Sequence, residues 1–126
     1  DKLIRDKLPE IMRSKGLGVF KRVMDDEGYI NCNCLKNKLL EEASEVLETK
    51  TQADIKEELA DLLEVMITLS HLQGLSFYDI EEARVKKKND KGGLDGRIYN
   101  AFVEMESSNQ SIAYYLARPD KYPEAN

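Results

Sequence analysis

The chain has 126 residues, a net charge of −5 at pH 7, 41% hydrophobic and 34% charged residues, and no Trp. This length suits one unit, so we expect a single domain over residues 1–126 with a core large enough to fold unaided. The negative charge disfavours nucleic acid and anionic membranes as partners. No apolar run is long enough to span a bilayer as a helix, so no membrane is expected as a partner.

The two cysteines and the first residues of the chain help to predict the cellular location of the protein. Cys32 and Cys34 are separated by one residue and have no second Cys or His pair, so a zinc site is not expected. We expect free thiols in a reducing cytoplasm. The start of the chain also lacks the charged-then-apolar layout of a signal peptide, and a cytoplasmic location is the expectation.

The first part of the chain predicts short elements. Residues 2–5 should be extended or irregular, and Asp6 is a candidate N-cap for a short amphipathic helix that ends near Gly16. Residues 19–30 mix apolar and basic side chains around an acidic turn. That pattern is also compatible with a small β-hairpin.

Two long amphipathic helices dominate the middle of the sequence. Apolar residues recur at helical spacing from about 33 to 48 and again from about 54 to 73, and the second run stops at Gly74. The apolar surface of the second helix is wide, so we expect a partner subunit to cover part of it. The predicted fold class is all-α, an oligomeric bundle in which these two helices pack antiparallel.

The C-terminal part is expected to be less regular. Ser76 can cap a third helix, which runs into a Lys-rich stretch ending in two glycines. Taken alone, this stretch indicates a solvated helix C-terminus, since Lys complements the helix dipole and Gly ends the helix. Residues 98–105 are compatible with a strand and residues 110–116 with a short helix. From Arg118 onward we expect a tail over the surface.

Two acidic clusters lie inside the long helical patterns. Glu42 and Glu45 in the first, and Glu58 and Asp61 in the second, are each three residues apart, which places each pair on one helical face. Antiparallel packing would aim the four carboxylates at one point, where their mutual repulsion favours a divalent cation. All-oxygen ligands favour Mg²⁺, with Mn²⁺ as a substitute. Geometry alone does not choose between this metal site and a solvated acidic face.

The Lys-rich stretch follows these carboxylates in the chain, and this combination indicates a possible function in phosphate binding. Carboxylates that hold a metal, next to a cluster of Lys and Asn, are what the binding of a di- or triphosphate needs. The chain has no Gly-x-x-x-x-Gly-Lys-[Ser/Thr] loop and no Gly-x-Gly-x-x-Gly turn, which excludes a P-loop and a Rossmann unit.

These motifs together resemble the MazG-like, all-α nucleoside triphosphate pyrophosphohydrolase superfamily. The opening Lys-Leu-Ile-Arg-Asp-Lys-Leu-Pro-Glu resembles its phosphoribosyl-ATP-pyrophosphohydrolase-like branch, and the matching motifs extend from Lys2 to about Gly93. The residues that carry the resemblance are Lys38-x-x-Glu41-Glu42-x-x-Glu45, then Glu58-x-x-Asp61, then the Lys/Asn-rich helix end.

The resemblance implies a homodimer or homotetramer that hydrolyses a nucleoside triphosphate between its α- and β-phosphates, which gives a monophosphate and pyrophosphate. The implied role is house-cleaning of non-standard or excess nucleotides. The implied Mg²⁺ ligands are Glu42, Glu45, Glu58 and Asp61. The implied catalytic residues are Lys38, Glu41 and Glu42, with Glu41 or Glu42 as the proton acceptor. The implied phosphate-binding residues are Lys87, Asn89 and Lys91, with Lys38 beside them.

Two other functions stay open at this point. A phosphoribosyl-ATP pyrophosphohydrolase of histidine biosynthesis would use the same acidic residues and differ only in its contacts to base and ribose. A non-catalytic helical oligomer would be an interaction module with a vestigial metal site. Loss of function should leave at least one ligand position replaced, and the retention of all four favours an enzyme.

Overall fold

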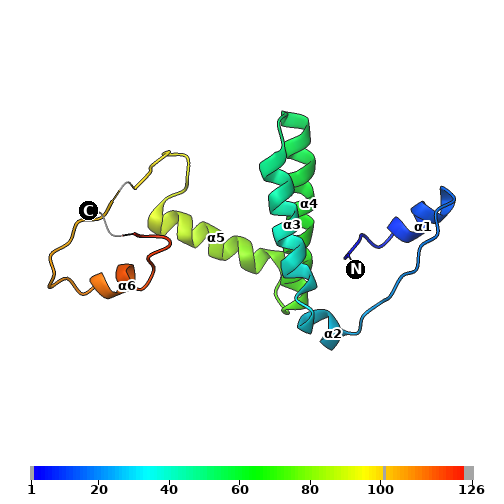
Figure 1. Cartoon of the computed structure of the whole chain (residues 1–126), viewed down its shortest axis with the longest axis horizontal. Helices are drawn as coiled ribbons and strands as arrows, with labels where there is room; N and C mark the ends of the chain where they lie inside the picture. Colours follow the sequence, from blue (N-terminus) through cyan, green and yellow to red (C-terminus); the bar gives the residue numbers. More distant parts are fainter. Residues whose placement is uncertain (1, 101, 124–126) are drawn as a thin grey trace. The chain divides into compact units, whose positions relative to one another are not determined.

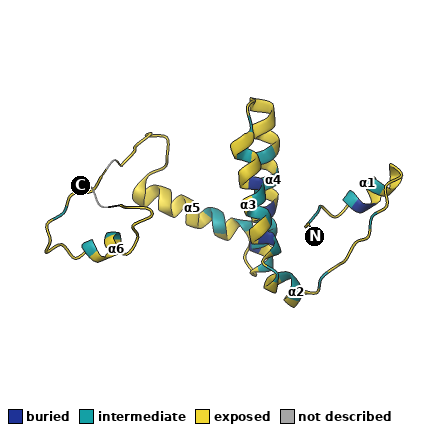
Figure 2. Ribbon diagram, in the orientation of Figure 1, coloured by how far each residue is buried: buried dark blue, intermediate teal, exposed yellow. Residues whose placement is uncertain are grey.

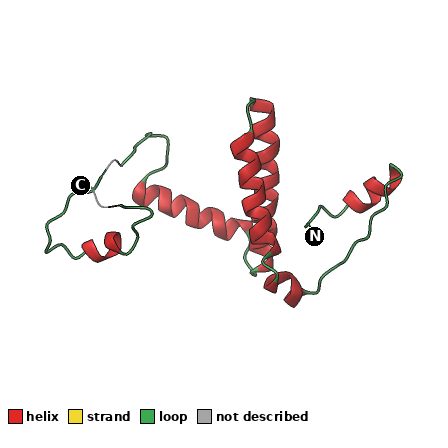
Figure 3. Cartoon of the chain, in the orientation of Figure 1, coloured by secondary structure: helices red, strands yellow, loops and turns green. Residues whose placement is uncertain are grey.

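The computed structural model describes residues 2–100 and 102–123 of the chain. The described residues form only helices, without a strand (Figures 1 and 3). The all-α class predicted from the sequence is therefore confirmed. None of the described helices is both long and apolar enough to cross a membrane. The helices are α1 (Leu8–Ser14), α2 (Asp26–Asn31), α3 (Cys34–Glu48), α4 (Gln52–Leu72), α5 (Phe77–Lys91) and α6 (Ile112–Leu116).

The chain divides into two compact units, Asp1–Lys87 and Lys88–Asn126. In the first unit α3 and α4 pack antiparallel along their length, as predicted (Figure 1). The Thr51 side chain accepts a hydrogen bond from the Asp54 backbone N–H at 3.1 Å and so caps α4, which begins slightly earlier than expected. Gly74 adopts a left-handed φ of 75° just after α4, the conformation that ends many helices.

Little apolar surface is buried within this single chain (Figure 2). Leu35 and Val65, 4% and 7% exposed, are the buried hydrophobic residues of the described part. Along α4, Ile55, Leu59 and Leu63 remain 38%, 48% and 42% exposed. The core within the described part of the single chain is small, because the contact between α3 and α4 covers one side of each helix. That the chain folds unaided stays a prediction.

Two predicted β elements are absent from the described residues. Asp25 accepts a hydrogen bond from the Gly28 backbone N–H at 2.7 Å and caps α2, so the acidic turn starts a helix where a hairpin was expected. Residues 98–100 and 102–105 have no regular structure, and position 101 of the expected strand lies outside the described residues.

The first helix also begins differently from the prediction. Lys7 occupies the N-cap of α1 and makes no side-chain capping bond, so Asp6 lies one position too early to cap it. Pro9 lies in the first turn, where its missing N–H costs nothing, and Gly16 follows the helix with a φ of 79°. Residues 2–5 are irregular, as predicted.

Cys32 and Cys34 form a disulfide, so the expectation of free thiols is wrong. Asn33 lies between them with a left-handed φ of 53°, a conformation that Asn tolerates better than most residues. The resulting bend between α2 and α3 brings the two Cα atoms to 5.1 Å, within the range that a disulfide requires.

In the second unit, α6 forms at the place predicted for a short helix, and three tyrosine rings gather around it. The rings of Tyr114 and Tyr115 have centroids 5.3 Å apart, and those of Tyr115 and Tyr122 have centroids 4.8 Å apart, both edge to face. The Arg118 guanidinium lies 3.9 Å from the centroid of the Tyr114 ring. The residues after Arg118 therefore return to α6 through Tyr122.

Candidate active site

Three carboxylates converge where α3 and α4 lie side by side. Glu42 on α3 and Glu58 and Asp61 on α4 each place one oxygen within 4.8 Å of the others. The i, i+3 spacing on α4 aims Glu58 and Asp61 at α3, and the antiparallel packing brings Glu42 to meet them. Glu42 is buried, while Glu58 and Asp61 are half-buried. We call these three residues the acidic triad.

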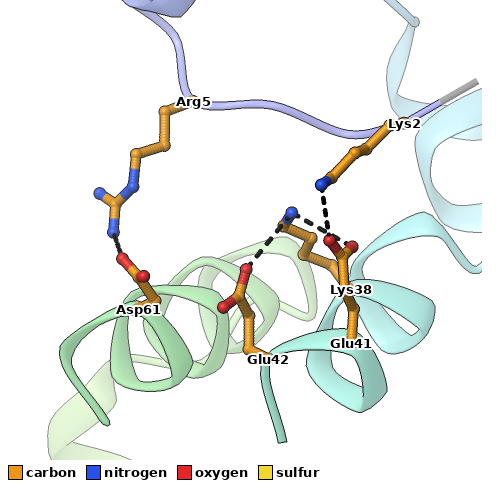
Figure 4. A network of polar contacts seen from close by, with 6 residues as sticks. All are labelled: Lys2, Arg5, Lys38, Glu41, Glu42 and Asp61. Atoms are coloured by element: carbon orange, nitrogen blue, oxygen red, sulfur yellow. Dashed lines mark hydrogen bonds and ion pairs between the residues drawn. The ribbon is translucent and has the colours of Figure 1, made fainter. Parts of the chain in front are cut away.

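Lys38 lies one helical turn before Glu41 and Glu42 on α3 and bridges both of them. Its Nζ is 3.2 Å from the Glu41 carboxylate and 3.3 Å from that of Glu42 (Figure 4). The Lys38 side chain is only 17% exposed and that of Glu42 only 11%, so this pair is shielded from water more than a surface pair. Lys38 therefore offsets part of the negative charge beside the triad.

Two further cations reach the carboxylates from the N-terminal arm, which we define as Lys2–Arg5. The Lys2 Nζ lies 2.9 Å from the Glu41 carboxylate, and the Arg5 Nη2 lies 2.5 Å from the Asp61 Oδ1 (Figure 4). Arg5 and Asp61 are 56 positions apart in the chain. The arm therefore ties the start of the chain to both α3 and α4.

The pKa values of two carboxyl groups differ in direction because their neighbours differ. Hydrogen bonds from Lys2 and Lys38 lower the pKa of Glu41 below its ordinary value. Partial burial, and then the negative charges of nearby carboxylates, raise the pKa of Glu58. Within the described part of the chain Glu58 forms no ion pair or hydrogen bond through its side chain. Glu58 is thus the triad member without a cation.

Comparison with known families identifies the family of the chain. A family model described as phosphoribosyl-ATP pyrophosphohydrolase matches residues 20–89, more than half of the chain. The chain belongs to this family. It is therefore a pyrophosphohydrolase of the MazG-like superfamily, a hydrolase that acts on phosphoric anhydrides, as the sequence motifs predicted. Comparisons with curated proteins and with solved structures give no significant match.

Members of the phosphoribosyl-ATP pyrophosphohydrolase family depend on a metal, and the triad of this member fits one. Carboxylate oxygens are the ligands that hard divalent cations prefer. Two oxygens bound to one Mg²⁺ lie about 3 to 4 Å apart, so oxygens already within 4.8 Å need only small side-chain movements. The uncompensated charge of Glu58 is a second feature that a cation would satisfy.

The fourth predicted ligand and the basic end of α5 lie outside the triad. Glu45 is exposed and is not one of the three converging residues, although its charge is close enough to help raise the pKa of Glu58. The predicted phosphate-binding residues Lys87, Asn89 and Lys91 are exposed near the C-terminal end of α5. The roles predicted for these four residues stay predictions.

Sequence reasoning missed the contacts of Lys2 and Arg5 with this family member's carboxylates. Their segment is irregular, so no helical spacing relates them to the acidic residues, and their partners lie on helices much later in the chain. The only available signal was the likeness of the opening residues to one branch of the superfamily, which says nothing about what those residues contact.

Proposed function

We propose that the chain is an Mg²⁺-dependent nucleoside triphosphate pyrophosphohydrolase that cleaves the bond between the α- and β-phosphates and removes non-standard or excess nucleotides. The observation that carries this proposal is the convergence of Glu42, Glu58 and Asp61 from two helices in a chain of a pyrophosphohydrolase family. The family implies a nucleotide substrate, whose phosphate oxygens match the hard-cation chemistry of this site.

The triad residues are the proposed metal ligands, with Glu45 at the edge of the same helical face. A bound divalent cation would supply Lewis-acid stabilisation of the phosphate charge and would activate the attacking water. Glu41 has a lowered pKa and is therefore ionised at neutral pH, so its carboxylate can accept a hydrogen bond and orient that water. Lys38 bridges Glu41 and Glu42 and so holds these carboxylates, and its ammonium group is the proposed contact for a substrate phosphate.

The first experiment measures pyrophosphate release from standard, deoxy- and modified nucleoside triphosphates and from phosphoribosyl-ATP, with Mg²⁺ and with EDTA. The variant is Glu58→Gln, and the matched control is Glu57→Gln, an exposed neighbour on the same helix. We expect Mg²⁺-dependent release that falls about 100-fold or more in Glu58→Gln, since metal catalysis contributes several kcal/mol. Equal rates in the two variants would contradict the proposed site.

One alternative substrate is favoured by a specific observation. The matching family model is described as phosphoribosyl-ATP pyrophosphohydrolase, which favours phosphoribosyl-ATP as a candidate of its own. The same carboxylates would serve that reaction, and only contacts to the base and ribose would differ. Exclusive release from phosphoribosyl-ATP in the panel above would replace the house-cleaning function with this one.

We also propose a homodimer or homotetramer in which α4 contacts a second copy. Ile55, Leu59 and Leu63 follow one another at helical spacing and stay exposed, which is more apolar surface than a monomeric helix usually presents. Light scattering after size exclusion should show an oligomer that Leu59→Glu dissociates. Leu94→Glu, at a residue 96% exposed in the other unit, is the control and should leave the oligomer intact. A wild-type monomer at all concentrations would contradict this.

A further inference from the structure

We propose that the N-terminal arm is part of the substrate site: Arg5 competes with the divalent cation for Asp61, and Lys2 and Arg5 both contact the nucleotide's phosphates. The proposal rests on the proposed function and adds two phosphate-binding residues to it. Neither residue lies within the matched span of the family, residues 20–89.

The position of the arm supports this assignment. Arg5 contacts Asp61, a member of the triad, and Lys2 contacts Glu41, the neighbour of the triad residue Glu42. Figure 4 shows the arm passing across the carboxylates with both cationic side chains directed toward them. Leu3 and Ile4, which lie between these two cations, are half-buried and hold the arm against the chain. The charged side chains at its two ends, Lys2 and Arg5, stay exposed.

The chemistry of the two cations suits phosphate. A guanidinium presents five N–H donors in a planar fork that matches phosphate oxygens, and Arg5 is shown using its Nη2 on one carboxylate oxygen. The side chains of Arg5 and Lys2 are 63% and 65% exposed, which leaves donors available to a ligand approaching from solvent. A triphosphate bound through a metal on the triad would lie within reach of both.

The same geometry makes the arm a competitor of the metal. A divalent cation on the triad withdraws the Asp61 charge that attracts Arg5 and adds a repulsive positive charge beside it. Exposed ion pairs of this kind are weak, so the arm can leave the carboxylate readily. Removal of Arg5 should therefore strengthen metal binding and weaken phosphate binding, two effects of opposite sign.

A purely structural arm predicts a different outcome. If Arg5 only holds Asp61 in place, its removal should weaken metal binding and phosphate binding together. Lys7 provides the matched control, because it is an exposed cation near the arm whose side chain contacts no carboxylate among the described residues. The comparison of Arg5→Gln with Lys7→Gln removes the general effect of losing one positive charge.

The experiment titrates the full chain by calorimetry, first with Mg²⁺ alone and then with inorganic pyrophosphate at saturating Mg²⁺. We expect Arg5→Gln to bind Mg²⁺ about three- to tenfold more tightly than Lys7→Gln and to bind pyrophosphate about tenfold more weakly, as expected for a lost charge-assisted hydrogen bond. Lys2→Gln should change both affinities in the same directions by less, and Arg5→Lys should restore part of the pyrophosphate affinity.

Weaker Mg²⁺ binding by Arg5→Gln, or affinities equal to those of Lys7→Gln, would overturn the proposal. Tighter Mg²⁺ binding with unchanged pyrophosphate affinity would also overturn it, since the arm would then compete with metal without contacting phosphate. Both titrations are independent of turnover. Failure of the proposed hydrolysis would be visible in the substrate panel and would leave these two readouts interpretable.

Discussion

The acidic triad with its cations and the tyrosine group around α6 are stabilised in opposite ways. The first joins residues as far apart as Arg5 and Asp61, 56 positions along the chain, through charges. The second joins Tyr114, Tyr115 and Tyr122 through rings that are close neighbours in sequence. The ring group can form from local chain alone, whereas the contacts of the acidic triad and its cations join the arm, α3 and α4.

Burial follows the same division. Among the described residues, every buried one lies in the first unit, and Glu42, 9% exposed, is the ionisable member of that set. In the second unit none of the described residues is buried, and Leu94, Ile98 and Tyr99 are 96%, 90% and 99% exposed. Long-range order is therefore concentrated in the unit that contains the acidic triad, and disturbing each region should affect different measurements.

The largest effect should come from neutralising Glu58, the triad member that has no cationic partner in the described part of the chain. Glu58→Gln should bind Mg²⁺ at least about 10- to 100-fold more weakly and lose the rise in Tm that Mg²⁺ produces in the wild type. In EDTA at pH 7 the same variant should melt at a higher temperature than the wild type, because the folded state disfavours the ionised Glu58. Thermal unfolding with and without Mg²⁺ measures both effects.

The dependence of stability on pH separately tests the direction of the Glu58 pKa shift. Because the folded protein raises the Glu58 pKa above its ordinary 4.5, the wild type loses stability as the pH rises through the raised value. Below pH 4.5 the carboxyl is protonated in both states, so the Tm advantage of Glu58→Gln in EDTA should disappear there. Glu57→Gln is the control, and an equal advantage for it would contradict this account.

An intermediate effect is expected from substitutions at the basic C-terminal end of α5. It would show that substrate binding is not confined to the residues around the acidic triad. If Lys87 and Lys91 contact phosphates, Lys87→Gln and Lys91→Gln should each raise the KM for the preferred nucleotide about three- to tenfold. Steady-state kinetics should show little change for Lys86→Gln, an exposed neighbour on the same helix. Equal changes at Lys86 would indicate a general charge effect.

The smallest effect should come from the tyrosine group. Tyr115→Ala removes two edge-to-face contacts, each worth roughly 0.5–1.5 kcal/mol, and should increase amide hydrogen exchange within residues 112–122. Mg²⁺ affinity and kcat should stay at wild-type values, because no carboxylate of the triad is involved. A comparable loss of activity in Tyr115→Ala would show that the two regions depend on each other.

The long helices could be predicted from sequence because local signals mark them. Helical spacing of apolar residues and the stop at Gly74 predicted the ends of α3 and α4 to within about two residues. The spacing of three residues between carboxylates then predicted which face of each helix carries the triad. Thr51 capped α4 by the same local chemistry. Each of these signals relates residues within about one helical turn of each other, and contacts over that distance can be predicted from a sequence pattern.

The features that sequence reasoning missed depend on geometry beyond that range. The disulfide between Cys32 and Cys34 needs the left-handed Asn33 between them. The ion pair of Arg5 with Asp61 joins segments that are far apart in sequence, and no helical or strand periodicity relates the two positions. The incomplete core could be foreseen only in part, since the width of an apolar face does not tell how much of it the same chain will cover.

The arm has a consequence for how a shorter version of this protein would behave. Trimming the chain to the shared family segment, residues 20–89, would retain every carboxylate of the triad but remove both Lys2 and Arg5. Such a fragment would contain the whole matched segment, yet its carboxylates would lack two of their cations. Where a family's common segment ends and where an individual member's working unit ends are therefore separate questions.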